Sequence, residues 1–94
     1  MQPHTSLAPN ALVGQRVLYR LTLNDCAEIG ARRNAMGIIN AGPLMPGALM
    51  PAVFVPVSGG AELGLHVMLN GPDSHWVPFP AGEGPGQGQW TWPA

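Results

Sequence analysis

The side chains best suited to chemistry in this sequence are one cysteine and three histidines. Cys26 follows Asn24-Asp25, which is typical of a helix start, and the first turn of a helix lowers the pKa of a thiol. A catalytic cysteine also needs a base within hydrogen-bond reach, and no Cys-Gly or similar signature surrounds Cys26. We therefore expect Cys26 to be a buried structural thiol.

The histidines are not spaced as metal ligands, since the sequence contains neither His-x-x-x-His nor His-Glu-x-x-His. His4 lies in an irregular stretch, and His66 alternates with leucines and should face outward or make one satisfied contact. Asp73 and His75 could form an acid–base pair, but an Asx turn at Asp73 explains the same residues. The glycine-rich segment 82–88 lacks the Gly-Lys-Ser/Thr of a phosphate loop. We expect no catalytic residue, no metal site, no cofactor and no enzyme activity.

Composition limits the class of protein further. The chain has 94 residues, which is one small domain, and only 10% of them are charged against about 25% in typical proteins. A net charge of −1 with no lysine argues against nucleic-acid binding. Five methionines and three tryptophans with so little charge are typical of surfaces covered by a partner. An oligomer or assembly component is therefore expected, with a small neutral monomer as the alternative.

The ends and the apolar stretches bear on localisation. The first ten residues have neither a basic region nor an apolar run, so a signal peptide is not expected. The longest apolar stretch, 44–57, is interrupted by prolines and glycine and cannot form a transmembrane helix. We expect a protein made in the cytoplasm that does not bind membranes.

Hydrophobic periodicity predicts a mainly β protein with one short helix. Residues alternate in period two over the expected strands 15–21, 51–57, 63–69, 76–79 and, as the last candidate, 90–92. A helix is expected at about 24–34, with Asn24 as its N-cap and its end before Gly37. The pattern predicts a small antiparallel barrel or sandwich of four to five strands. An extended arm, 1–12, would precede a single domain, 13–94.

The alternation also predicts which side chains are buried and which form contacts. Segment 36–50 is too apolar for a solvated linker, so it should lie over the core or against a neighbouring molecule. Trp90 and Trp92 share one strand face, and both core packing and an interface are open to them. The expected core residues are Val17, Tyr19, Leu21, Ile29, Val53, Val55, Leu65, Val67, Leu69 and Trp76. The expected interface residues are Leu44, Met45, Leu49, Met50, Phe54, Trp90 and Trp92.

Several short motifs follow one another in a recognisable order. They are Gly14-x-x-Val17-x-Tyr19, a helical segment 25–33 ending in arginines, Pro51-Ala52-Val53-x-Val55, Leu69-Asn70-Gly71, Trp76-Val77 and Gly86-x-Gly88-x-Trp90-x-Trp92-Pro93. In this order the chain resembles an uncharacterised family of short phage and prophage proteins. The chain departs from that pattern at 56–58, where Pro-Val-Ser replaces Arg-Val-Trp. The resemblance implies a viral origin and a small β-rich domain, and it brings no catalytic residues.

Together these observations lead to an expected function. We expect a phage-encoded, non-enzymatic structural or interaction protein, associated with the virion as a capsid or tail accessory. Its partners would be further copies of itself, other virion proteins, or both, with no nucleic acid, membrane or small-molecule substrate. It would be made in the host bacterial cytoplasm and then join the virion. An intracellular phage factor that binds a host protein is the alternative.

Overall fold

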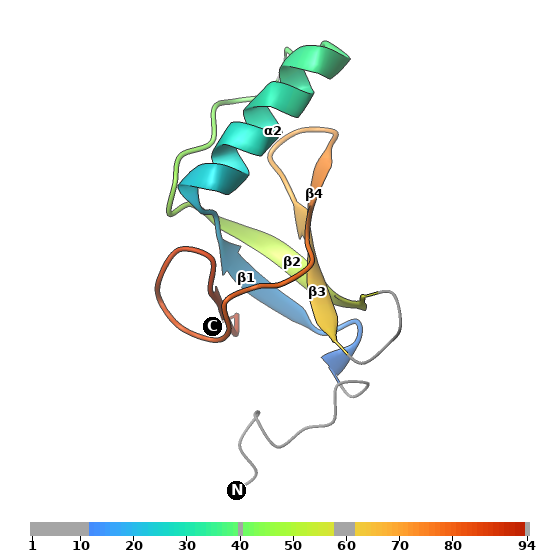
Figure 1. Cartoon of the computed structure of the whole chain (residues 1–94), viewed down its shortest axis with the longest axis vertical. Helices are drawn as coiled ribbons and strands as arrows, with labels where there is room; N and C mark the ends of the chain where they lie inside the picture. Colours follow the sequence, from blue (N-terminus) through green and yellow to red (C-terminus); the bar gives the residue numbers. More distant parts are fainter. Residues whose placement is uncertain (1–11, 40, 58–61, 94) are drawn as a thin grey trace, which may run out of the picture.

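The computed structural model describes residues 12–39, 41–57 and 62–93. The expected arm 1–12 therefore lies outside the described residues, except for Leu12. Five strands and one long helix follow one another in these described residues (Figure 1). Their bounds are β1 (Arg16–Arg20), α2 (Leu23–Met36), β2 (Leu49–Pro56), β3 (Leu63–Met68), β4 (Ser74–Val77) and β5 (Trp90–Thr91).

The strands form one antiparallel sheet in the order β4-β3-β2-β1-β5. The mainly β prediction with a single helix is confirmed, and the sheet stays open, so the barrel alternative is wrong. Strand β4 begins at Ser74, two residues before the expected 76–79, because Ser74 and His75 already pair with Met68 and Val67. The β5 edge is covered by the loop before it, since Gly84 donates to the Trp90 carbonyl at 3.0 Å.

Helix α2 is longer than the sequence predicts because its caps lie outside the expected ones. Thr22, and not Asn24, is the N-cap, and its side chain accepts a hydrogen bond from the Asp25 amide. The Asp25 carboxylate in turn accepts from the Thr22 amide, which completes a capping box. The helix ends at Gly37, whose φ of 73° is a left-handed conformation that favours glycine. The expected loop 36–50 is therefore confined to residues 37–48.

The core lies on one face of the sheet, against α2 and the C-terminal segment. Its buried apolar residues are Val17, Tyr19, Leu21, Ile29, Ala52, Phe54, Leu65, Val67 and Val77. Leu44, Ala48, Trp90 and Trp92 pack against this cluster from the loop and the C-terminal end. None of the described helices is both long and apolar enough to cross a membrane.

Strand β2 turns the opposite face to the core from the one expected. Ala52 and Phe54 are buried, while Val53 and Val55 are half-buried on the other side. The pairs Ala52↔Val67 and Phe54↔Leu65 put the inward residues of β2 opposite those of β3. Both faces of β2 are apolar, so alternation identified a strand without showing which face points inward.

Three further expected positions are corrected in the structure. Trp76, an expected core residue, is 44% exposed because it lies on the face away from α2. Phe54, an expected interface residue, is only 4% exposed and packs edge-to-face against Trp90 at 5.1 Å. Leu69 is only partly buried, at the margin of the core.

Candidate functional site

A buried polar cluster joins β1, the start of α2 and β4. The Tyr19 hydroxyl donates to Asp25 Oδ2 at 2.6 Å, and His75 Nε2 lies 3.0 Å from Asp25 Oδ1. All three residues are buried, although His75 is 50 residues from Asp25 in the sequence. Asp25 therefore takes part in the capping box with Thr22 and also binds one side chain from each of two strands.

This cluster shifts the protonation of its members in opposite directions. Burial, followed by the hydrogen bond to Asp25, raises the pKa of Tyr19 far above its ordinary range. Burial alone would raise the pKa of Asp25 as well. The hydrogen bonds donated by Tyr19, the Thr22 amide and His75 outweigh burial and lower the Asp25 pKa. The carboxylate is therefore ionised at neutral pH, and the phenol is neutral.

Two charged residues of α2 flank the imidazole of His75. Glu28 Oε1 lies 3.9 Å from His75 Nε2 on the same side as Asp25. Arg32 Nη2 lies 3.4 Å from Nδ1 and donates to the Ser74 carbonyl at 3.0 Å. Because Nδ1 faces a donor, the proton that His75 shares with Asp25 is assigned to Nε2. Asp25, Glu28 and His75 each place one metal-ligating atom within 4.8 Å of the others.

A second polar cluster fixes the C-terminal half of α2 to the β3–β4 turn. Arg33 makes a two-pronged ion pair with Asp73, with Nε–Oδ2 at 2.8 Å and Nη2–Oδ1 at 2.9 Å. The same guanidinium donates to Asn70 at 2.9 Å and to the Gly42 carbonyl at 3.2 Å. The hydrogen bonds that Arg33 donates to Asp73 lower the pKa of the Asp73 carboxyl. The turn residue Asp73 therefore binds the helix through Arg33. The hydrogen bonds of His75 go to Asp25 and Arg32, so the two residues do not form the acid–base pair considered from the sequence.

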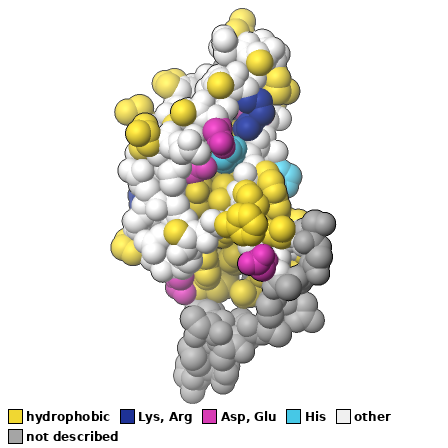
Figure 2. Space-filling model, viewed as in Figure 1, with side chains coloured by type: hydrophobic (Ala, Val, Ile, Leu, Met, Phe, Trp, Pro, Cys, Tyr) yellow, Lys and Arg dark blue, Asp and Glu magenta, His cyan; other side chains and the backbone are white. Residues whose placement is uncertain are grey.

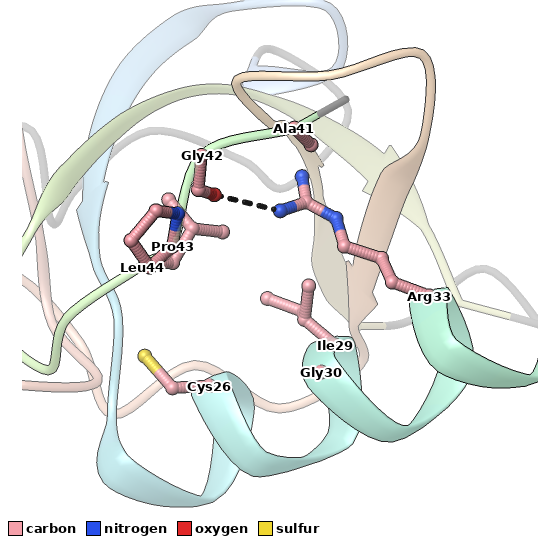
Figure 3. A pocket seen from close by; sticks show the side chains of 8 residues that line it. All are labelled: Cys26, Ile29, Gly30, Arg33, Ala41, Gly42, Pro43 and Leu44. Carbon is pink, nitrogen blue, oxygen red and sulfur yellow. Dashed lines mark hydrogen bonds between the residues drawn. The ribbon is translucent and has the colours of Figure 1, made fainter. Parts of the chain in front are cut away.

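Cys26 faces a pocket of about 260 Å³ between α2 and residues 41–44 (Figure 3). Burial, followed by the charge of Asp25, raises the pKa of the Cys26 thiol, so the expected helix-start effect does not prevail. Arg33 is the charged residue that lines the pocket. Its guanidinium already donates hydrogen bonds to Asp73, Asn70 and the Gly42 carbonyl. The pocket lining therefore offers neither a thiolate nor an unpaired charge. It is lined by Cys26, Ile29, Gly30, Arg33, Ala41, Gly42, Pro43 and Leu44.

The face of the sheet opposite the core is apolar along its middle. Register places Val53 between Arg16 of β1 and His66 of β3, and His66 is followed by Trp76 of β4. The next row contains Leu18 opposite Pro51. We call Leu18, Pro51, Val53, Val55, Met68 and Trp76 the open sheet face; all six are exposed or half-buried. No second layer formed by the described residues covers it.

The open sheet face differs from the set of interface residues expected from the sequence, most of which lie elsewhere. Met45 and Leu49 are exposed, whereas Leu44, Met50, Trp90 and Trp92 are half-buried against the core. His66 is exposed and bonds Ser74 at 2.8 Å, as its alternation with leucines predicts. His4 lies outside the described residues. Figure 2 shows hydrophobic side chains gathered in a patch in the middle of the view.

Sequence reasoning missed the Asp25–Glu28–His75 cluster. Asp25 and Glu28 are three residues apart on one helix, which is a readable signal. Only the fold brings His75 from β4 beside them. Comparison with protein-family models, curated proteins and solved structures found no match.

Proposed function

We propose that this chain is a non-enzymatic interaction protein whose contact surface is the open sheet face. The observation that carries this proposal is the apolar middle of that face. An antiparallel sheet with one solvated face usually alternates apolar-in with polar-out residues. Here β2 places Val53 and Val55 outward, and β4 adds Trp76, which is 44% exposed. Contiguous apolar surface of this kind marks an interaction site.

The distribution of charge supports a covered surface. Of the nine charged side chains, Arg33 and Asp73 are bound to each other and Asp25 is buried. The open sheet face has Arg16 and Arg20 on β1, at either side of Leu18, and no carboxylate in the rows that register defines. Arg20 donates to the Gly47 carbonyl at 2.7 Å. Depletion of charge with exposed Met and Trp is the composition of an interface centre.

Another copy of the chain is the partner that we propose. A five-stranded sheet with a central strand of eight residues spans roughly 20 × 25 Å. Pairing two such faces covers about 500 Å² per copy, below the roughly 800 Å² of a standard interface. Contact between copies is therefore weak in dilute solution and strengthens when neighbouring copies are tethered together. That behaviour suits an accessory protein held on a larger particle.

The phage part of the proposal rests on the ordered motifs from Gly14 to Pro93 that resemble short phage and prophage proteins. In this role the protein is a capsid or tail accessory of the virion. Quantitative mass spectrometry of purified particles tests it, and the expected result is a fixed number of copies per particle. Absence from particles, together with a stoichiometric host partner in pull-downs, would overturn the virion role and favour the host-binding alternative.

A further inference from the structure

The cluster at the junction of α2 and β4 lies apart from the open sheet face. We infer that Asp25, Glu28 and His75 form a binding site for one divalent transition-metal ion of the Zn²⁺ class. The ion would connect the first two turns of the helix to the edge strand. This inference does not depend on the proposed interaction surface, which lies on the other side of the sheet.

The donor atoms have the right types and separations. His75 Nε2 lies 3.0 Å from Asp25 Oδ1 and 3.9 Å from Glu28 Oε1. Ligands bound to zinc at about 2.0–2.2 Å lie about 3–4 Å from one another, so both separations are already compatible. The three donors lie within 4.8 Å of one another, and a small rotation of the Glu28 side chain closes the longest separation. Glu28 is 59% exposed and free to make that rotation.

The surrounding contacts prepare Asp25 to act as a ligand through one oxygen. Oδ2 is occupied by the Tyr19 hydroxyl at 2.6 Å and the Thr22 amide at 2.9 Å. Oδ1 is left with His75 as its side-chain partner. Hydrogen bonds that orient a ligating carboxylate in this way raise metal affinity.

Two carboxylates and one guanidinium, that of Arg32, surround the imidazole of His75. Two carboxylates converge on a single imidazole N–H, which can be donated to only one of them. Among the described residues, no arginine comes within ion-pair distance of Asp25 or Glu28. A divalent ion between the carboxylates would offset this repulsion, and the exposed Glu28 gives it a path from solvent.

Metal binding changes the proton on His75 and its relation to Arg32. As the metal–nitrogen bond forms at Nε2, the proton leaves that nitrogen for solvent and Nδ1 takes one up from solvent, so the imidazole carries the same number of protons before and after binding. Arg32 Nη2, 3.4 Å from Nδ1, is a donor and cannot bond a protonated Nδ1. Arg32 must therefore turn away, and its charge opposes the ion. Removing that charge should strengthen binding, which a purely structural role for Arg32 does not predict.

Titration of the full chain with Co²⁺ followed by visible absorption, and with Zn²⁺ by calorimetry, tests the site. We expect one ion per chain and a rise in melting temperature with Zn²⁺. Glu28→Gln should weaken binding by more than about tenfold while the metal-free fold is retained, and His75→Asn should abolish it. Arg32→Gln should strengthen binding.

Matched controls separate this site from chance surface binding. Glu62→Gln removes another exposed carboxylate, and His66→Asn removes the exposed histidine on β3; neither should change the affinity. Absence of binding to the unmodified chain would overturn the inference. Equal affinity in the Glu28→Gln and Glu62→Gln variants, or loss of binding in His66→Asn, would overturn it as well.

Discussion

The hydroxyl of Tyr19 donates a 2.6 Å hydrogen bond to the carboxylate of Asp25, so β1 is fixed to the N3 residue of the capping box that begins α2. Both groups are buried, and the bond is made to a charged acceptor, which makes it stronger than a neutral one. The start of the helix is thereby fixed relative to the sheet. This contact sets the position from which Glu28 and Arg32 reach His75.

Replacement of this hydroxyl should destabilise the fold. Tyr19→Phe keeps the ring in the core but removes one of the donors to Asp25 Oδ2. We expect a loss of about 1–3 kcal/mol in the free energy of unfolding, measured by urea denaturation. An unfolding midpoint equal to that of the unmodified chain would show that the contact contributes nothing to stability.

Stability should fall at acidic pH. The pKa values of Asp25 and Asp73 are lowered in the folded state from an ordinary 3.8. Their contribution is present above that value and is lost as pH falls through the lower folded values, because the unfolded chain takes up protons first. Urea midpoints measured between pH 7 and pH 2 should decline below about pH 4. Asp73→Asn should make this decline shallower, and an unchanged slope would contradict the assignment.

At alkaline pH the folding stability should fall, because the pKa of Tyr19 is raised in the folded state. Its folded pKa is raised above the ordinary 10.0 by burial and then by Asp25. The contribution is complete below pH 10 and is lost as pH rises toward the folded value. Tyr19→Phe should reduce this alkaline loss, which is followed by urea midpoints between pH 8 and pH 11; the Cys26 thiol, whose pKa is also raised in the folded state, accounts for the remainder. Persistence of the same alkaline loss in Tyr19→Phe would assign it to another group.

The Arg33–Asp73 pair should show strong coupling. Its side chains are only 9% and 6% exposed, so Arg33→Met leaves Asp73 charged without its partner. We expect roughly 3 kcal/mol of destabilisation, measured by urea denaturation. The double variant Arg33→Met with Asp73→Ala should lose less than the sum of the two single variants. Additive losses would show that the two groups act independently.

Two glycines give a matched test of the packing. A Cβ at Gly64 would lie 2.6 Å from the Trp76 ring and 2.8 Å from the Val77 carbonyl, so Gly64→Ala must displace both. We expect a cost of about 1–3 kcal/mol and a shift in tryptophan fluorescence. A Cβ at Gly30 on α2 meets nothing within 4 Å, so Gly30→Ala should stabilise the helix by about 0.5–1 kcal/mol. Equal effects of the two changes would contradict the position of Trp76 over Gly64.

The sequence was most informative where one pattern had one physical meaning. Alternation at Val17, Tyr19 and Leu21 predicted buried side chains that the structure places in the core. It failed at β2 because valines, alanine and phenylalanine made both faces apolar. The residue types at the helix start also led to a wrong N-cap, Asn24. The true cap, Thr22, is defined by its reciprocal hydrogen bonds with Asp25, which residue types alone do not reveal. His75 joined the cluster only through the β3–β4 pairing, a long-range contact that local spacing does not reveal.

The central claim is that the open sheet face mediates contact between copies, and sedimentation velocity over a wide concentration range tests it most directly. Met68→Glu places a charge on that face, whereas Met36→Glu places the same charge at the end of α2; the two methionines are 40% and 63% exposed. The account predicts concentration-dependent association of the unmodified chain and of Met36→Glu, and its loss in Met68→Glu. A monomer at every concentration in the unmodified chain, or association unchanged in Met68→Glu, would contradict it.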